Sequence, residues 1–269
     1  MTAPLRIAAV QMTSQENKAR NVETAVRWVR EAHSLGASFV GLPENVAWMG
    51  PEEARGEAAE PLDGPTSSRF AELARELSVT LLAGSVLETG GPAGRLYNTS
   101  VLYGPDGARL ALYRKMHLFD VDAADGASYR ESDAVAPGDV ISVAQTVLGK
   151  VGLSICYDVR FPELYRAQSR EGAVMLTVPS AFTLMTGKDH WEVLLRARAI
   201  ENQAYVLAPA QVGQNGKGRA TFGNALVVDP WGLVTARASE GEGLAVATFD
   251  PELISRIRGR LPALLHRRM

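Results

Sequence analysis

Short apolar runs typical of buried strands recur along the whole chain, and segments with helical periodicity stand between them. The first run covers residues 5–11, and Gly36 can end the helix that follows it. That helix is predicted from apolar side chains at one-face spacing, namely Val22, Val26, Val29 and Ala32. Repeated alternation of strands and helices predicts an α/β fold.

A second unit of the same kind follows, and two hairpins come after it. Thr66 or Ser67 can cap a helix, and residues 79–87 supply the next strand. That helix would bury Phe70, Leu73, Ala74 and Leu77. The hairpins are predicted at residues 96–115, turning at 104–107, and at residues 141–155, turning at Gly149-Lys150. Crossovers and hairpins together indicate sheets of mixed strand order.

The remaining chain continues the alternation without a linker. Helices are predicted at residues 162–170, 190–202 and 251–260, and strands at 174–178, 205–210, 224–228 and 244–249. No stretch rich in Pro, Ser or Gly and no block of charge divides this series. We therefore expect one domain over residues 1–269, a length that single α/β domains of about 250 residues commonly reach.

Composition excludes several functions. The net charge is −2 and no Lys or Arg run forms a patch, so a nucleic-acid partner is not expected. No apolar stretch approaches the roughly 18–20 residues that span a bilayer. The first residues lack the charged leader and apolar region of a signal peptide, so a cytoplasmic location without membrane association is expected.

Neither a metal nor an organic cofactor is expected. The four histidines, at 33, 117, 190 and 266, lack the spacing of metal ligands. The glycine-rich residues 213–218 do not form a phosphate-loop motif, and a flexible turn between strands explains them.

Three reactive residues come directly after predicted strands. Glu44, Lys115 and Cys156 are separated by 71 and 41 positions, so they form no local motif. Strand ends meet at one edge of an α/β sheet, where ligands bind, so these side chains can converge there. Taken alone, Glu44 or Lys115 also reads as a solvated charge, and Cys156, the only cysteine, as a small buried apolar residue.

Amide hydrolysis would explain the grouping. A free thiol with a pKa near ~8.5 is largely protonated at neutral pH, so the nucleophile needs a base. A carboxylate such as Glu44 can take that proton and return it to the leaving nitrogen. The Lys115 ammonium and the backbone N–H of Tyr157 can stabilise the tetrahedral oxyanion.

Five segments together resemble the nitrilase, or carbon-nitrogen hydrolase, superfamily. The resemblance covers nearly the whole chain, and the segments occur in the expected order. They are GLPE at 41–44, YRKMHLFD at 113–120, GLSICYDVRFPEL at 152–164, HWEVLLRARAIENQ at 190–203 and VDPWG at 228–232.

The resemblance implies an α-β-β-α sandwich with mixed sheets that forms a homodimer. It assigns Glu44 as base, Lys115 as oxyanion partner and Cys156 as nucleophile. It also places a second glutamate beside the lysine, and Glu131 matches that position. An ordinary acidic loop residue is the other interpretation of Glu131.

Within the superfamily, the chain resembles the deaminated glutathione amidases, with the ω-amidases as near relatives. The resemblance implies a substrate whose far end is a carboxylate or 2-oxo acid. Arg160 can bind such a carboxylate with bidentate hydrogen bonds, although it could equally form a structural ion pair. Phe182 and Thr186 would line the pocket, next to Tyr157.

The expected activity is therefore hydrolysis of a terminal carboxamide of a small acidic metabolite to carboxylate plus ammonia, through a Cys156 thioester. Deaminated glutathione is the first candidate substrate. The alternatives are an ω-amidase acting on 2-oxoglutaramate or 2-oxosuccinamate, an N-carbamoyl amidase and a true nitrilase. A catalytically silent binding scaffold is the alternative outside the enzyme class.

Overall fold

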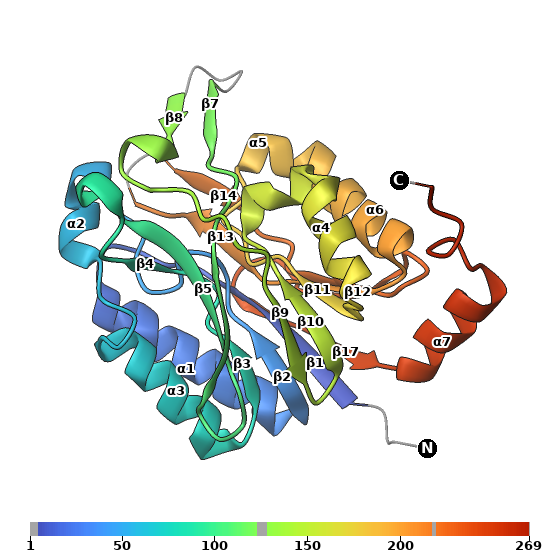
Figure 1. Ribbon diagram of the computed structural model, residues 1–269. Coiled ribbons are helices and arrows are strands. Elements are labelled where there is room, and N and C mark those ends of the chain that lie inside the picture. Colours follow the sequence, from blue (N-terminus) through green and yellow to red (C-terminus); the bar gives the residue numbers. More distant parts are fainter. Residues whose placement is uncertain (1–4, 123–127, 217–218, 269) are drawn as a thin grey trace.

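Two β-sheets face each other, and helices cover the outer face of each (Figure 1). The computed structural model describes residues 5–122, 128–216 and 219–268. Helices α1 (Lys18–Ser34) and α3 (Pro65–Leu77) lie on one side, and α4 (Pro162–Arg170) and α6 (Glu192–Asn202) on the other. The expected α-β-β-α sandwich with mixed sheets is confirmed.

The first sheet has nine strands built around three neighbouring parallel ones. These are β1 (Leu5–Met12), β2 (Ala37–Gly41) and β3 (Thr80–Leu82). The sheet is completed by β4 (Val86–Glu88), β5 (Tyr97–Tyr103), β6 (Arg109–Arg114), β13 (Ala210–Gln214), β14 (Ala220–Phe222) and β17 (Gly243–Phe249). Of these six, only β13 pairs in parallel, with β1.

The second sheet has six strands and the same mixture of directions. Strands β10 (Gly149–Leu153), β11 (Met175–Thr177) and β12 (Tyr205–Ala208) are parallel. Antiparallel neighbours are β9 (Val143–Thr146), β15 (Leu226–Val228) and β16 (Val234–Arg237). Cys156 follows β10, so this sheet supplies the thiol.

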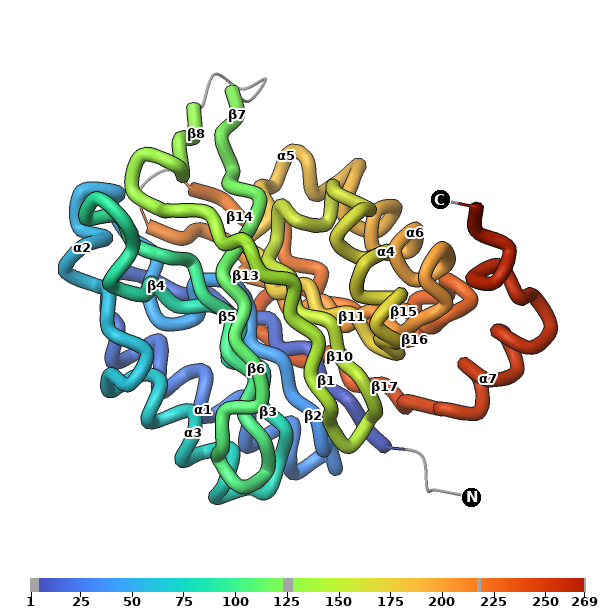
Figure 2. The backbone as a smooth tube through the Cα atoms, viewed as in Figure 1, coloured from blue at the N-terminus to red at the C-terminus, as the bar shows by residue number. Residues whose placement is uncertain are grey.

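Shorter elements complete the chain. Figure 2 shows the hairpin of β7 (Asp120–Asp122) and β8 (Ser128–Arg130) projecting above the sandwich, and α7 (Pro251–Arg260) lying away from the other helices. The rest are α2 (Arg55–Ala58), α5 (Leu184–Thr186), the 3₁₀ turns η1 (Glu52–Ala54), η2 (Pro92–Gly94), η3 (Glu131–Asp133) and η4 (Cys156–Arg160), and the π-turn η5 (Gly187–Trp191).

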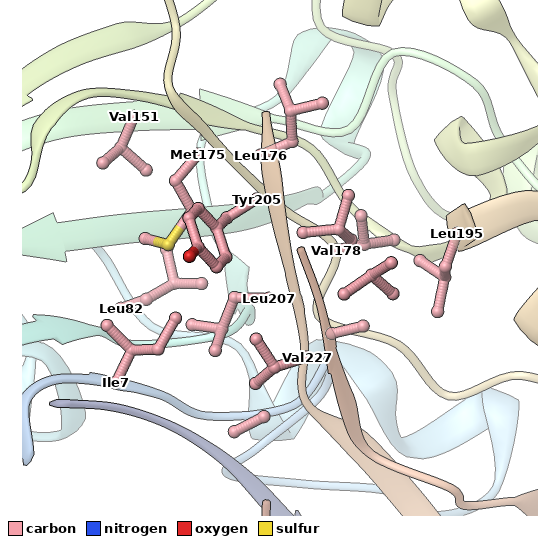
Figure 3. Packing of buried hydrophobic residues seen from close by; sticks show 14 of the residues in the cluster. Ile7, Leu82, Val151, Met175, Leu176, Val178, Leu195, Tyr205, Leu207 and Val227 are labelled. Carbon is pink, nitrogen blue, oxygen red and sulfur yellow. The ribbon is translucent and has the colours of Figure 1, made fainter. Parts of the chain in front are cut away.

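Alternating side chains of β1 divide the core into two clusters. Ile7 and Ala9 pack between the sheets, whereas Ala8 and Val10 pack under α1 and α3. Figure 3 shows Ile7 and Leu82 of the first sheet close to the second sheet's side chains. Full burial of a Val or Leu side chain contributes about 1.5–3 kcal/mol to stability, so these contacts hold the two sheets together.

The ends of the first helix, α1, are determined by residues that flank it in the sequence. The Asn17 side chain accepts a hydrogen bond from the Arg20 N–H at the start of α1. Val29 and Ala32 are fully buried, whereas Val22 is only half-buried. Gly36 follows the helix end at φ +85°, a conformation that favours glycine.

Some predicted boundaries were wrong. Helix α3 begins at Pro65 after an extended Gly64, so Thr66 and Ser67 lie in its first turn and do not cap it. The predicted strand at residues 79–87 is two strands, β3 and β4. Gly84 separates them at φ +39°, where a Cβ would lie 2.0 Å from the Pro43 carbonyl oxygen. This close approach fixes the backbone beside Glu44.

Other differences concern short elements. The second hairpin turns at residues 147–148, before the predicted Gly149-Lys150. Strands β13, β14 and β16 were not predicted, because runs of three to five residues with mixed polarity give little periodic signal. The glycine-rich segment does connect two strands, β13 and β14, although residues 217–218 of it lie outside the described residues.

Candidate active site

Glu44, Lys115 and Cys156 line one cavity. Each follows a strand, β2, β6 and β10 respectively, as the sequence predicted. The Lys115 Nζ donates to Glu44 Oε1 at 2.9 Å and to Glu131 Oε2 at 2.8 Å. Side chains that are distant in sequence thus form one charged cluster beside the only thiol.

Lys115 is a buried cation between two carboxylates. Only 2% of its side chain is exposed. Burial alone would lower its pKa, but the negative charges of Glu131 and Glu44 outweigh burial and raise the pKa well above the usual value. The ammonium therefore stays charged, as an oxyanion partner requires.

Glu131 depends on the same cation. Burial would raise the pKa of its carboxyl group, but the Lys115 charge and the hydrogen bonds from Lys115 and the Phe119 N–H hold that pKa below the usual value. The carboxylate remains ionised and is the second acceptor of the Lys115 ammonium, beside Glu44. This contact excludes the interpretation of Glu131 as an ordinary solvated acid.

The Glu44 carboxylate is held at both oxygens. Its Oε1 accepts hydrogen bonds from Lys115 and from Asn98 Nδ2, the latter at 3.0 Å. Its Oε2 accepts the Ala181 N–H at 2.8 Å. Because the side chain is only 3% exposed, these partners fix its position next to the thiol.

Cys156 lies at a sharp turn between β10 and α4. Its φ of +48° is in the left-handed region, and its N–H donates to the Pro179 carbonyl at 2.9 Å. Such strain persists only where surrounding contacts enforce it, and it is common at functional sites. Burial raises the pKa of the thiol well above its usual value, the Glu44 charge raises it further, and Lys115 offsets part of the increase. The resting thiol is therefore protonated and needs a base.

The turn is fastened by Asp158, which sequence reasoning did not single out. Its Oδ2 accepts the Ile155 N–H and the Tyr113 hydroxyl, both at 2.8 Å. Its Oδ1 accepts the His117 N–H at 3.1 Å and lies 2.7 Å from His117 Nδ1. The fully buried carboxylate thus joins the backbone before Cys156 to both sides of Lys115.

The residues predicted to bind substrate divide between two adjoining cavities. Phe182 and Thr186 line the cavity that holds Cys156. Tyr157 and Arg160 line a neighbouring cavity, which shares Thr186 with the first. The Arg160 guanidinium lies 5.3 Å from the Phe182 ring centre and donates to His190 Nδ1 at 3.2 Å. Arg160 therefore adjoins the thiol's cavity without lining it, and its contacts are not those of a buried ion pair.

Three polar residues at the site were missed. Asn98 on β5 donates to Glu44 and also to Glu131 Oε1, at 3.1 Å. In the sequence Asn98 stands next to Thr99 and Ser100 in a predicted strand, so nothing distinguished it from its polar neighbours. Arg55 and Arg219 line the wall of the cavity. Nothing in their sequence surroundings separates these two arginines from ordinary surface charges.

The described residues contain neither a metal-binding cluster nor a helix that could cross a membrane. Within residues 5–122, 128–216 and 219–268, no group of three or more His, Cys, Asp or Glu side chains is arranged to hold a metal ion. No helix in that same part of the chain has the length and apolar character needed to cross a membrane.

Comparison with known proteins identifies the family of this chain. Residues 6–259 match the profile of the family described as Carbon-nitrogen hydrolase. The chain is 47% identical over 267 residues to a deaminated glutathione amidase of Synechocystis, covering 98% of both chains. It is 38% identical to the human omega-amidase NIT2, covering 98% of this chain and 95% of that protein.

A solved structure gives the same result. The NitFhit protein of C. elegans superposes with a TM-score of 0.92 and 38% identity, covering 98% of this chain and 65% of that longer one. Sequence, fold and relatives agree that the protein is an amidase acting on carbon–nitrogen bonds other than peptide bonds. The chain belongs to the carbon-nitrogen hydrolase family of the nitrilase superfamily.

Proposed function

We propose that this protein hydrolyses the amide bond of a small 2-oxo acid amide, with deaminated glutathione as the preferred substrate. The observation that carries the proposal is the Lys115 ammonium, held between Glu44 and Glu131 in the cavity of Cys156. Similarity to deaminated glutathione amidases over nearly the full chain supports the choice of substrate.

Each residue of the cluster has a step in the reaction. The Cys156 Sγ attacks the amide carbon while Glu44 takes the thiol proton. Lys115 and the Tyr157 N–H stabilise the oxyanion, and Glu131 keeps Lys115 in place. Glu44 returns the proton to the leaving nitrogen, the carbon–nitrogen bond breaks, and a thioester remains. Water, deprotonated by Glu44, then releases the carboxylic acid and the thiol.

The leaving group depends on the substrate. Deaminated glutathione has no terminal carboxamide, so the expected release of ammonia is wrong for this substrate. Its amide nitrogen belongs to cysteinylglycine, and hydrolysis yields 2-oxoglutarate and that dipeptide. A terminal carboxamide such as 2-oxoglutaramate or 2-oxosuccinamate releases ammonia instead. We propose that Arg160 binds the carboxylate of the 2-oxo acid, and that Phe182 and Thr186 form the wall beside it.

An ω-amidase is the second candidate, because the human omega-amidase is 38% identical to this chain. The decisive experiment compares kcat/KM on deaminated glutathione, 2-oxoglutaramate, an N-carbamoyl compound and a simple nitrile. Release of 2-oxoglutarate should be fastest from deaminated glutathione, and Cys156→Ala should abolish it. Preference for 2-oxoglutaramate would favour the ω-amidase, and turnover that persists in Cys156→Ala would remove the proposed nucleophile.

We also propose that the whole chain is one domain that acts as a cytoplasmic homodimer. Exposed apolar side chains gather where α6 meets the turn after β15, and Gly232 of that turn packs against Ile200. The patch consists of Val193, Ile200, Trp231 and Leu233. Sedimentation should give twice the monomer mass, and Ile200→Glu should yield monomers. A wild-type monomer at high concentration would contradict the dimer.

A further inference from the structure

Two arginines line the cavity of Cys156 without a role in the chemistry above. Arg55 is the first residue of α2, and Arg219 directly precedes β14. Both contribute to the wall, together with Tyr129 from β8. Their convergence from separate parts of the chain places two guanidinium groups beside the reacting thiol.

A single carboxylate oxygen stands between the two arginines. Glu52 Oε1 lies 3.0 Å from Arg55 Nη2 and 3.6 Å from Arg219 Nη2. The side chains of Arg55 and Arg219 are only 12% and 27% exposed, but that of Glu52 is 57% exposed. Arg219 also lies over the Tyr129 ring, 5.5 Å from its centre. Glu52 lines the same cavity, but its side chain is more exposed than those of the two arginines, so it is the member of this group that can turn out into solvent.

Charge within the cavity is unevenly distributed. The cluster of Lys115, Glu44 and Glu131 carries a net charge of −1, so it repels an anion near the thiol. The outer cluster of Arg55, Arg219 and Glu52 carries a net charge of +1. A carboxylate that enters the cavity is therefore attracted to the arginines while its amide reaches Cys156.

We propose that Arg55 and Arg219 bind a carboxylate on the leaving-group half of the substrate, and that this carboxylate takes the place of Glu52. A guanidinium presents five N–H donors in a planar fork, which suits a carboxylate. The inference rests on the proposed function, in which Arg160, in the adjoining cavity, binds the acyl end. Two cationic positions then match a substrate with a carboxylate at each end.

Deaminated glutathione has this shape, because the 2-oxo acid carries one carboxylate and the glycine of the leaving dipeptide carries the other. The test uses three substrates: deaminated glutathione, its analogue with the glycine carboxylate converted to a carboxamide, and 2-oxoglutaramate. The wild-type enzyme should prefer the first over the second by about 10- to 100-fold in kcat/KM, as expected for hydrogen bonds to a charged group.

Substitutions then test whether Arg55 and Arg219 cause the preference for the glycine carboxylate. The double variant Arg55→Gln with Arg219→Gln should lose the preference but hydrolyse 2-oxoglutaramate within about twofold of wild type, which shows that it is folded. Glu52→Gln should act in the opposite direction and lower KM for deaminated glutathione. Arg30→Gln, which breaks an exposed ion pair on α1, is the matched control and should change neither value.

Other results would overturn either the arginine site or the proposed function. A wild-type enzyme without the preference, or a double variant that keeps it, would overturn the arginine site. Parallel losses on deaminated glutathione and 2-oxoglutaramate would also overturn it, because the arginines would then act on the common chemistry. A wild-type enzyme that hydrolyses none of the three substrates would instead reject the proposed function.

Discussion

The hydroxyl of Tyr113 donates a 2.8 Å hydrogen bond to the buried Asp158 carboxylate, and this contact joins β6 to the turn that carries Cys156. The same carboxylate oxygen accepts the Ile155 N–H, one residue before the thiol. Asp158 Oδ2 therefore helps to position both the thiol of Cys156 and the ammonium of Lys115. Asp158 is a positioning residue, because it contacts residues next to Cys156 and Lys115 and not the reacting atoms themselves.

Asp158→Asn should lower kcat by about 10- to 100-fold with little change in KM, because a 1 Å misplacement of reacting groups has that effect. The asparagine keeps the volume but replaces one acceptor with a donor that faces N–H and O–H groups. Steady-state kinetics measure the split. Asp229→Asn is the control, since Asp229 is also buried and accepts the Trp231 and Leu233 N–H groups away from the site. Equal losses in both variants would deny Asp158 its positioning role.

Glu44→Gln should separate thiol reactivity from turnover. Loss of the base should lower kcat by at least about 10²-fold. The Glu44 charge is one cause of the raised pKa of Cys156, so its removal lowers that pKa and should speed alkylation by iodoacetamide at pH 8. Mass spectrometry reports labelling of the single cysteine, and Cys156→Ser gives the background. If alkylation slows together with turnover, Glu44 is not raising the thiol pKa.

Asn98→Asp should move the acidic limb of the kcat/KM profile to higher pH. A third carboxylate beside Glu44 and Glu131 raises the pKa of the Glu131 carboxyl group through like-charge repulsion, so its protonation begins at higher pH. Asn98→Ser removes the amide without adding charge and is the matched control. Rates measured from pH 4 to pH 8 test this, and an acidic limb that does not move in Asn98→Asp would contradict the proposed electrostatic link.

Convergence of the reactive residues was predictable because it depends on strand ends. Glu44 and Lys115 follow strands of the first sheet, whereas Cys156 follows a strand of the second. The expectation that the three strand ends lie at one edge of a single sheet was therefore wrong, because the site forms where strand ends of two facing sheets meet. The layer order was implied by family resemblance, not by periodicity. The way the two sheets pack on each other could not be predicted from the sequence, because it depends on tertiary contacts such as those of Ile7 with the second sheet.

Residues that act through tertiary contacts escaped the sequence analysis. Asn98 stands between Tyr97 and Thr99 in β5 and looks like an ordinary strand residue until two carboxylates face it. Arg55 and Arg219 could be recognised as site residues only from the structure, in which both line one cavity. Arg160 was predicted as the anchor for a substrate carboxylate, and its side chain lies in the adjoining cavity.

Lys115→Met should lower the free energy of unfolding at pH 7 by about 3–5 kcal/mol, because it leaves Glu44 and Glu131 buried without their cation. In the wild type, the lowered pKa of Glu131 contributes stability above the unfolded pKa of about 4.3, and this is lost as pH falls. The raised pKa of Lys115 contributes stability below about 10.4, and this is lost as pH rises through the folded pKa.

The deficit of Lys115→Met should therefore shrink as pH falls from 7 to 5. Without the ammonium, burial raises the pKa of the Glu131 carboxyl group, so it takes up a proton in this range and part of the uncompensated charge disappears. Urea unfolding at several pH values measures the deficit. Lys150→Met, which removes a lysine that contacts only the Glu171 carbonyl at the surface, should show no such pH dependence. A deficit that is constant from pH 7 to pH 5 would mean that the cation does not hold the Glu131 carboxylate in its ionised form.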